Sequence, residues 1–372
     1  MKDIIIVGYN SFSKEVIDKI KEQKNIKIIL DDLTSDTSYS SITIDRISNI
    51  NKYIDNSDIY VIDDMPYFDE IYHKLYKNNV GEINVIVKED IDDIDENILS
   101  NQYIHKYNLQ NKPVLRYIET HITDVCNMKC NGCTHFSNIC DEDKTNFEKF
   151  KKDISLLAKN FDVTIIRLMG GEPLLKKNLN EYIDYTREKY PYSTIFIVTN
   201  GMLITKMSDA TIKSIKRNNI IINISLYEPT LKIINNIERF LSENNIRHRY
   251  GRGNKKAIKE DYITKFHTCL STKEENRNEK LKCYNQYCWF LRNEKIYKCP
   301  YPALISILND KYNLNFKDVD SYCDLSKCNC GWNSIEKLSR TNSFCKYCRN
   351  QIKEYDWNNN APELSYYLLD DK

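Results

Sequence analysis

Short runs of β-branched and other apolar residues alternate with helical patterns along most of this chain. In the N-terminal part these runs fall at Ile4–Val7, Ile26–Leu30, Tyr60–Ile62 and Ile83–Val87. Continuous apolar strands are typical of a parallel sheet that helices cover on both faces. Between them, Val16, Ile17 and Ile20 recur at helical spacing. We therefore predict an α/β fold, with a parallel sheet as the first domain in residues 1–111.

The same alternation restarts in residues 112–258 with more regular spacing. Candidate strands are centred near Ile118, Ile165, Phe196, Ile222 and His248. The helices between them carry one apolar face each, and the helix after the fourth strand opens at Pro229, which suits a first-turn position. Units of this kind predict part of a (β/α) barrel of the TIM type, whose chemistry lies at the carboxyl ends of the strands.

Charge and hydropathy narrow the classes of partner. Lysine and arginine total 54 against 53 aspartate and glutamate, so the net charge is +1. This balance argues against a broad electrostatic attraction to nucleic acid or to an anionic membrane. No apolar run approaches the roughly 20 residues that cross a bilayer, and the apolar run before Gly8 is too short for a secretory signal. We expect a cytoplasmic protein.

The cysteines form two groups. None of the thirteen precedes Cys126; four lie between Cys126 and Cys140, and nine between Cys269 and Cys348. An odd number in two tight groups, in a chain without an export signal, argues against a disulfide framework and for metal ligation. Cysteines are therefore expected to organise residues 259–356, a region of short segments, and residues 357–372 are read as a tail.

The first group, Cys126-x3-Cys130-x2-Cys133, directly follows a candidate strand at residues 117–123. Three thiolates on one loop can each bind a different iron of a cubane cluster, which leaves the fourth iron open. A structural zinc or iron–sulfur loop is the alternative. Cys140, just beyond, is interpreted as a buried thiol.

Two polar segments follow the next two strands and so fall at the same rim. They are Gly170-Gly171-Glu172-Pro173 and Thr199-Asn200-Gly201. Glycines allow a close approach of the backbone, and Glu172 can receive an ammonium group. Both segments fit a molecule that docks on the open iron.

These three motifs, in this order, resemble the radical S-adenosylmethionine (SAM) superfamily over roughly residues 115–250. The resemblance implies that Cys126, Cys130 and Cys133 hold a 4Fe–4S cluster and that SAM chelates its unique iron. Gly170, Gly171 and Glu172 would match the segment that contacts the amino group of SAM, and Ser225 the strand end that contacts its ribose. It also implies a flavodoxin- or ferredoxin-type reductant, reductive cleavage of SAM to a 5′-deoxyadenosyl radical, and hydrogen abstraction from a substrate.

One position departs from the family pattern. The residue before the last cluster cysteine is usually aromatic and lies against the adenine, whereas this chain has Gly132. His135 or Phe136 is expected to take that role. His121, at the strand end before the loop, is interpreted as a packed or hydrogen-bonded residue.

The second cysteine group resembles the SPASM or twitch extension of radical SAM enzymes, which holds auxiliary 4Fe–4S clusters. We expect one such cluster on Cys288, Cys299, Cys345 and Cys348, with Cys283 as a strong competitor and a zinc site as the alternative. A β-hairpin with Asn293-Glu294 in its turn is expected between Cys288 and Cys299. Four more cysteines, namely Cys269, Cys323, Cys328 and Cys330, are left as candidates for a second cluster.

The N-terminal segment around Gly8, with Asp31 after the second strand, resembles the Rossmann-like domain of bacterial sugar acetyltransferases. Asp31 lies where an acidic group can bind a ribose hydroxyl, although only Gly8 remains of a glycine-rich loop. A scaffolding role for this domain competes with nucleotide binding. Three functions follow: a radical SAM enzyme acting on a small molecule or nucleotide-linked sugar, a radical SAM peptide-modifying enzyme, and a non-catalytic iron–sulfur scaffold or redox sensor.

Overall fold

The computed structural model of this protein describes most of the chain. The described residues are 2–64, 68–91, 94, 97–100, 104–251, 256–257, 262–275, 283, 285, 288–317, 320–327, 330–339, 343–360 and 362–369. They form two compact units. The first comprises Met1–Arg116, Phe161–Thr164 and Tyr190–Thr194, and the second comprises Tyr117–Asn160, Ile165–Lys189 and Ile195–Lys372.

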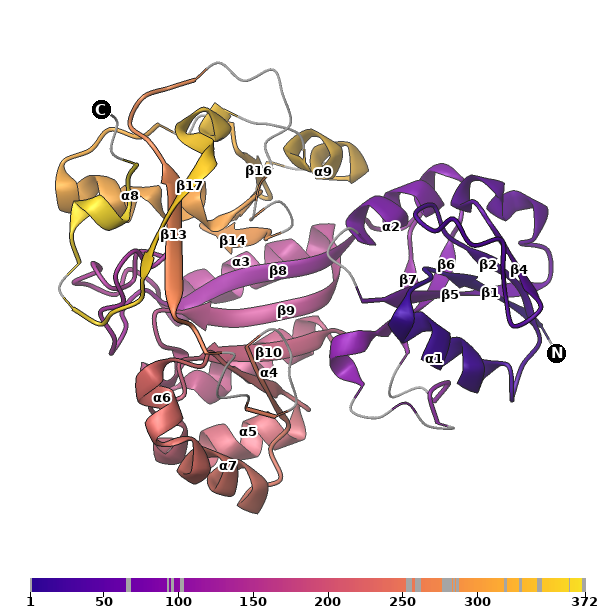
Figure 1. The fold of residues 1–372 in the computed structure, drawn as a ribbon, viewed down its shortest axis with the longest axis horizontal. Coiled ribbons are helices and arrows are strands. Elements are labelled where there is room, and N and C mark those ends of the chain that lie inside the picture. Colours follow the sequence, from indigo (N-terminus) through magenta and orange to yellow (C-terminus); the bar gives the residue numbers. More distant parts are fainter. Residues whose placement is uncertain are drawn as a thin grey trace. The chain divides into compact units, whose positions relative to one another are not determined.

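The first unit is built on a seven-stranded sheet in the order β3-β4-β2-β1-β5-β6-β7 (Figure 1). The strands are β1 (Asp3–Val7), β2 (Ile26–Leu30), β3 (Ser38–Tyr39), β4 (Ile42–Asp45), β5 (Ser57–Asp63), β6 (Glu82–Val87) and β7 (His105–Asn108). Pairing is parallel from β4 to β6, and only the edge strands β3 and β7 run antiparallel. The four predicted strands are confirmed as β1, β2, β5 and β6.

Helices α1 (Ser11–Ile20) and α2 (Phe68–Lys77) belong to this unit. Helix α1 begins with a capping box, in which the Asn10 side chain accepts from the Ser13 N–H and the Ser13 hydroxyl accepts from the Asn10 N–H. Its buried face carries Val16, Ile17 and Ile20, as the spacing predicts.

Most of an eight-stranded sheet in the order β12-β11-β10-β9-β8-β14-β15-β16 belongs to the second unit. Its parallel part consists of β8 (Val114–Thr123), β9 (Asp162–Gly170), β10 (Thr194–Thr199), β11 (Ile221–Ile224) and β12 (His248–Tyr250). These are the five strands expected in residues 112–258. On the other side of β8 the sheet continues with β14 (Phe290–Arg292), β15 (Lys295–Tyr297) and β16 (Tyr322–Asp324) instead of further βα units. The α/β fold class with parallel sheets is therefore confirmed.

Helices connect the parallel strands. They are α3 (Phe147–Asn160), α4 (Leu179–Lys189), α5 (Asp209–Arg217), α6 (Glu228–Lys232) and α7 (Ile234–Glu243). Pro229 lies in the first turn of α6, as predicted. The single helix expected there is divided, however, because Ile233 leaves helical geometry with φ −118° and ψ 9°.

The predicted hairpin is confirmed as β14 and β15, which pair antiparallel. Asn293 and Glu294 form its turn, and both have positive φ angles, of 50° and 63°. The Asp153 carboxylate on α3 accepts hydrogen bonds from both backbone N–H groups of this turn. These bonds hold the hairpin turn against α3.

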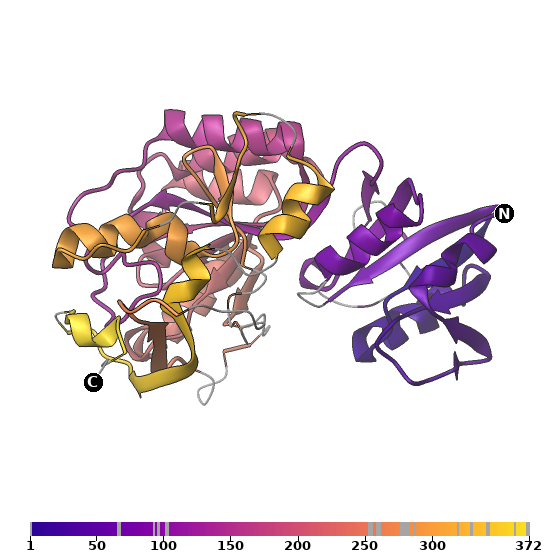
Figure 2. The same cartoon turned by 90° about the horizontal axis from the view of Figure 1, so that it is seen from above.

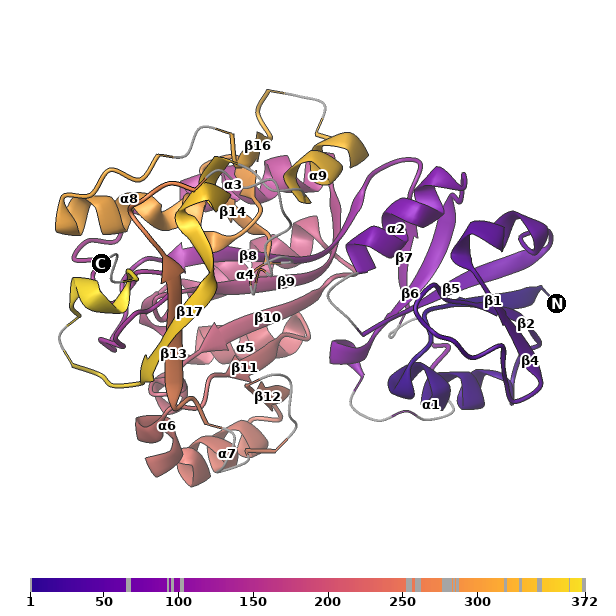
Figure 3. The ribbon, with the colours of Figure 1, turned by 45° about the horizontal axis from the view of Figure 1, so that its top comes forward.

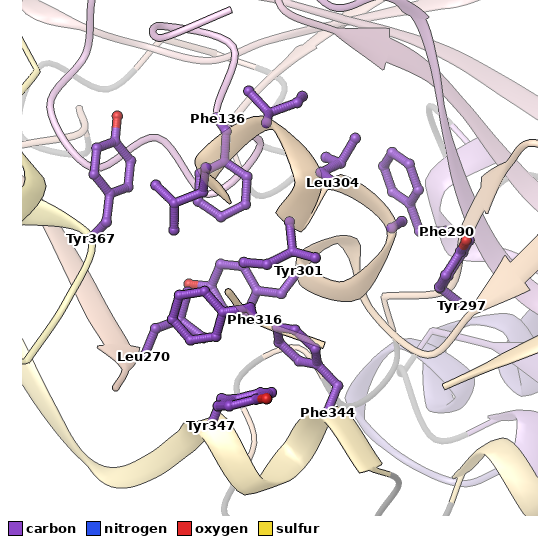
Figure 4. Packing of buried hydrophobic residues seen from close by; sticks show 14 of the residues in the cluster. Phe136, Leu270, Phe290, Tyr297, Tyr301, Leu304, Phe316, Phe344, Tyr347 and Tyr367 are labelled. Carbon is purple, nitrogen blue, oxygen red and sulfur yellow. The ribbon is translucent and has the colours of Figure 1, made fainter. Parts of the chain in front are cut away.

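The remaining elements of the second unit are two antiparallel strands and two helices, namely β13 (Lys265–Leu270), β17 (Cys348–Asp356), α8 (Pro300–Tyr312) and α9 (Trp332–Ser339). A buried aromatic cluster joins β13, β17 and α8 (Figure 4). It includes Phe136 from the first cysteine loop, Tyr301 and Leu304 on α8, and Tyr367 near the C-terminus. Short 3₁₀ helices occur at Ile47–Lys52, Lys88–Asp90, Pro173–Leu175, Ile204–Lys206, Ser343–Tyr347 and Leu364–Tyr366.

The segment after β17, expected to be a tail, is integrated into the second unit (Figure 2). The Leu369 N–H donates to the Leu270 carbonyl, and the Tyr367 hydroxyl donates to the Asn138 side chain. Across the described residues, no helix combines the length and hydrophobicity that a bilayer crossing requires.

Candidate active site

A cavity of about 160 Å³ lies at the carboxyl ends of β8, β9, β10 and β11. Its lining includes eight residues predicted from the sequence, namely Cys126, Cys130, Cys133, Gly170, Gly171, Thr199, Asn200 and Ser225. These residues come from four separate strand ends, so the fold brings the motifs together as the strand–helix alternation predicts.

The first cysteine loop surrounds its sulfur atoms with N–H donors. The Cys126 sulfur accepts from the Met128 N–H at 3.4 Å. Burial raises the pKa of Cys133. Hydrogen bonds from the backbone N–H groups of residues 135–138 stabilise its thiolate and offset part of that rise. Burial also raises the pKa of Cys126 and of Cys130 to about 12. Sulfur atoms that accept N–H bonds inside a buried site are suited to ligate a cluster, because a bound metal keeps a thiol deprotonated.

Among the described residues, no three His, Cys, Asp or Glu side chains converge closely enough to hold a single metal ion. In a cubane cluster each cysteine binds a different iron, so its ligand sulfurs need not converge on one point.

Gly170 and Gly171 bring the end of β9 directly onto the cysteine loop. The Gly171 N–H donates to the Thr123 carbonyl at 2.9 Å, and Gly170 has a φ of +150°. A Cβ atom on Gly170 would lie 2.0 Å from the Thr123 oxygen, and one on Gly171 2.0 Å from the Val125 oxygen. The glycines thus permit backbone-to-backbone contact within the protein, in addition to any approach by a ligand.

Glu172 does not line the cavity, in contrast to its expected ammonium-binding role. Its side chain is fully buried and accepts from the Thr199 hydroxyl at 2.7 Å and from the backbone N–H groups of Asn200 and Leu174 at 2.9 and 3.0 Å. Burial raises its pKa to about 7. Glu172 joins the Gly-Gly segment to the Thr-Asn-Gly segment. Pro173, the next residue, begins a 3₁₀ helix and likewise does not line the cavity.

Of the two candidates for the missing aromatic residue, only His135 reaches the cavity. Phe136 is buried in the aromatic cluster, where its ring stacks at 6.0 Å on Tyr301. The space beside Gly132 is filled by Tyr355 of β17, since a Cβ on Gly132 would lie 1.5 Å from the Tyr355 hydroxyl oxygen.

Two further aromatic side chains line the cavity and were not predicted. Tyr227 follows Ser225 by two residues, and Phe266 lies on β13, with ring centroids 6.4 Å apart. The position of Tyr227 just beyond a predicted strand end was a usable signal. Phe266 had none, because its place depends on the pairing of β13 with β17.

His121 is a packed, hydrogen-bonded residue, as interpreted from the sequence. Its Nδ1 lies 2.9 Å from Asp124 and its Nε2 lies 2.8 Å from His135. Burial lowers the pKa of His121 to about 4. Asp124 in turn forms a two-point ion pair with Arg292 at 2.8 Å, and this contact fixes the start of the cysteine loop.

The second cysteine group is assembled around the aromatic cluster, against which Cys269, Cys299 and Cys348 pack. Leu270, the residue after Cys269, pairs with Cys348 across β13 and β17, and hydrogen bonding to Cys269 is the main cause that raises the pKa of Cys348. Burial raises the pKa of Cys283 and of Cys299, and negative charge on Cys345 raises both further.

Cys288 has neighbours in both the second cysteine group and the parallel sheet. Burial raises its pKa to about 12, Glu119 and Cys283 raise it further, and Arg167 lowers it. Cys288 in turn raises the pKa of Cys299. Phe290, two residues later, pairs with Glu119 of β8. The structure therefore adds Cys269 and Cys283 to the neighbourhood of the four expected ligands.

Two of the four cysteines considered for a second cluster form a disulfide that was not expected. Cys323 and Cys330 are joined in a disulfide. This pairing corrects the expectation that both are free to ligate a second cluster. Cys328 lies outside the described residues. Cys140 is buried, as interpreted, and its thiol contacts the Glu142 carbonyl.

In the first unit, the Asp31 carboxylate is engaged within the protein. One oxygen accepts from the Leu33 and Thr34 N–H groups at 2.7 and 2.8 Å, and the other accepts from the Tyr9 N–H at 3.0 Å. Asp31 is also only 4% exposed. These bonds brace the turn after β2.

Residues 120–261 match the family model described as the radical SAM superfamily. The chain therefore carries a radical SAM domain, and the superfamily expected from its motifs is confirmed at this level. The match spans less than half of the chain and contains the first cysteine loop, the Gly-Gly segment and Ser225.

The relatives include the GTP 3′,8-cyclase of Alkaliphilus oremlandii (strain OhILAs), which is 30% identical over 112 residues, covering 29% of this chain and 35% of that protein. The probable GTP 3′,8-cyclase of Saccharolobus islandicus (strain Y.N.15.51 / Yellowstone #2) is 31% identical over 126 residues, covering 32% of this chain and 38% of that protein. The chain thus spans little more than a third of the length of these relatives. The matches support the class of radical SAM enzymes.

Among solved structures, BtrN in complex with AdoMet and 2-DOIA matches with a TM-score of 0.40 and 15% identity, over 64% of this chain and 94% of that chain.

Proposed function

We propose that this protein is a radical SAM enzyme whose active site is the cavity at the ends of β8–β11. The observation that supports the proposal most is that three cysteines, two glycines, Thr199-Asn200 and Ser225 line a single cavity although they come from four strand ends. A structural iron–sulfur loop does not require such a cavity beside its cysteines.

In this proposal Cys126, Cys130 and Cys133 hold a 4Fe–4S cluster. With SAM bound, the cluster supplies one-electron cleavage of the sulfonium and hydrogen abstraction from the substrate. In the same proposal the backbone of Gly170 and Gly171 contacts the amino group of SAM and Ser225 contacts its ribose, and all three residues line the cavity. Glu172 acts indirectly, because it holds Thr199 and Asn200 in place.

Around this centre the protein excludes water with aromatic rings. Tyr227 and Phe266 line the cavity together with His135. Burial raises the pKa of Tyr227 far above its usual range, and charge on the three cysteines adds to that rise, so its hydroxyl stays protonated beside them. These side chains limit the access of solvent to the cavity, which protects a reactive intermediate from side reactions.

We also propose a SPASM- or twitch-like auxiliary 4Fe–4S cluster in the Cys-rich extension. Cys299, Cys345 and Cys348 remain the expected ligands. For the fourth ligand, the pairing of β13 with β17 favours Cys269 over Cys288, with Cys283 as its competitor.

The domain division proposed is 1–111, 112–258 and 259–356, followed by residues 357–372. The substrate is proposed to be a small molecule, and the electron donor a flavodoxin or ferredoxin of the cytoplasm. For the first unit we propose a Rossmann-like scaffold. The Asp31 side chain is only 4% exposed and both of its oxygens already accept backbone N–H groups, which weakens the case for a nucleotide-linked sugar. The parallel sheet of that unit likewise gives no support to a peptide-modifying enzyme with a winged-helix leader domain.

The decisive test is anaerobic reconstitution with iron and sulfide, followed by SAM and dithionite. The parent should release 5′-deoxyadenosine, and the triple variant C126A/C130A/C133A should not. A parent that binds iron but never cleaves SAM would instead indicate the scaffold or redox sensor. Deuterium transfer from labelled candidate substrates into 5′-deoxyadenosine then identifies the substrate class.

The auxiliary cluster is tested by counting iron. The parent should bind about eight irons and the variant C345A/C348A about four, because two clusters of four irons are proposed. C269A should lose auxiliary iron, whereas C288A should retain it. Loss in C288A with full iron in C269A would restore the ligand set expected from the sequence.

A further inference from the structure

The position at which radical SAM enzymes usually carry an aromatic residue cannot hold one in this chain. Gly132 lies in the left-handed region, with a φ of +59°. A Cβ atom there would lie 1.5 Å from the Tyr355 hydroxyl oxygen and 2.9 Å from the Tyr366 carbonyl oxygen. Strand β17 and the segment after it therefore fill this space, and an aromatic contact with the adenine of SAM has to come from another part of the cavity.

Strand β17 is anchored to the cysteine loop and holds β13 beside it (Figure 3). The Asn131 side chain donates to the Asp356 carbonyl at 3.0 Å and accepts from the Asn358 N–H at 2.8 Å. Tyr355 and Phe266 are paired in register across the two strands, so their side chains lie on the same face of the ribbon. This pairing places Phe266 in the lining of the cavity, next to the cysteine loop.

Phe266 and Tyr227 form a corner of the cavity. Their rings are nearly perpendicular, at 84°, with centroids 6.4 Å apart, and both side chains line the cavity. A flat ligand ring that stacks on one of them meets the other at an edge, and aromatic rings favour both arrangements. The corner is therefore suited to a planar aromatic group.

This corner lies at the strand end where the ribose of SAM is proposed to bind. Tyr227 follows Ser225 by two residues, and the Leu226 carbonyl between them accepts from the Ile263 N–H at 2.8 Å, just before β13. Among the described residues, the other aromatic side chain in the lining is His135, which comes from the cysteine loop. Because adenine is joined directly to the ribose, an aromatic corner at this strand end is placed to receive it.

We infer that Phe266, on β13 of the Cys-rich extension, is the residue that stacks on the adenine of SAM, with Tyr227 at the edge of the adenine ring. Phe266 then takes the role that the sequence assigned to His135 or Phe136. The SAM site becomes composite, because the match to the radical SAM family ends at residue 261 and Phe266 lies beyond it. This inference rests on the proposed function and adds to it a cofactor-binding residue from the extension.

The test measures the affinity of SAM by equilibrium dialysis against the full-length protein reconstituted with iron and sulfide. Each variant must first retain the SAM-responsive cluster, whose electron paramagnetic resonance signal changes when saturating SAM is added. F266A should bind SAM about 5- to 150-fold more weakly than the parent, which is the effect of removing one aromatic ring stacked on a base. F266Y keeps the ring and should bind SAM like the parent. F240A makes the same substitution on α7, outside the lining, and should also bind like the parent.

Equal SAM affinity in F266A and the parent would overturn the inference. If F266A loses the cluster, F266L keeps apolar volume at this position and lacks the ring. Weaker SAM binding by F266L then supports the inference, and unchanged binding overturns it. A weaker affinity in H135A together with parent-like affinity in F266A would return the adenine contact to the cysteine loop. A parent that holds its iron but does not bind SAM would show instead that the proposed function is wrong.

Discussion

Single residues determine how closely the loops of the site approach one another. Gly170 and Gly171 leave room for the Thr123 and Val125 carbonyls, which a Cβ atom would displace. Glu172, next in the chain, uses a buried carboxylate to hold the neighbouring Thr199-Asn200 segment. Two residue types that suggest ligand contact in the sequence therefore also carry out internal positioning.

Substitution of Gly171 by alanine should disrupt the cysteine loop. The new Cβ would lie 2.0 Å from the Val125 oxygen and 2.7 Å from the Cys126 nitrogen, so the backbone must move. We expect a loss of about 3 kcal/mol in the free energy of unfolding and a loss of cluster iron. Urea unfolding of the metal-free protein and an iron assay measure both. G331A is the control, because nothing lies within 4 Å of its added Cβ; equal effects of the two variants would refute the steric argument.

Glu172 should make stability depend on pH. Burial raises its pKa from 4.5 to about 7 in the folded protein. Between these two pH values the folded state binds more protons than the unfolded state. The contribution of Glu172 to stability is therefore most favourable below pH 4.5 and falls as the pH rises to 7. The fall attributable to this group is about 3 kcal/mol at most. Unfolding of metal-free E172Q at pH 5, 6 and 7 should lack this part of the fall, and parallel profiles for parent and variant would contradict the assignment.

At the scale of elements, local sequence patterns predicted the parallel strands but did not predict pairings between segments far apart in the chain. The strands near Ile118, Ile165 and Phe196 were found because each is a continuous apolar run next to a helix. The antiparallel pair of β13 and β17 joins segments that are far apart in the sequence. The residue pattern of one strand does not predict that it pairs with the other. That pair determines the places of Phe266 and Trp357, neither of which was assigned to a site, and of Cys269, which was left as a candidate for a second cluster.

Asn131 gives a direct test of this pairing. Alanine at this position leaves the Asn358 N–H without its side-chain acceptor and removes the donor to Asp356. Because the Asn131 side chain is fully buried and makes both bonds, we expect N131A to lose about 3 kcal/mol in the free energy of unfolding and to bind less iron. N236A, on the exposed face of α7, should behave like the parent. An N131A protein with unchanged stability would show that the C-terminal segment does not support the loop.

At the scale of the whole molecule, the second unit joins two candidate cluster sites through one strand. Strand β17 begins at Cys348, in the second cysteine group, and ends at Asp356, whose carbonyl accepts a hydrogen bond from Asn131 of the first cysteine loop. The sequence motifs located both cysteine groups because ligands within a loop are close in the chain. The connection between the groups was not predictable, because the residues that make it after Asp356 include no cysteine and follow no known pattern.

The C-terminal residues should therefore be required for cluster binding although they contain no ligand. A chain that ends at Trp357 lacks Asn358, which bonds to Asn131, and Tyr367, which is 2% exposed in the aromatic cluster. Loss of a buried aromatic side chain alone costs about 3–5 kcal/mol. We expect this truncation to lower the melting temperature and to lose iron from the SAM-responsive cluster, whereas a chain that ends at Leu369 keeps every described contact and should match the parent. Full iron and normal SAM cleavage in the shorter chain would show that the cysteine loop holds its geometry without the C-terminal segment.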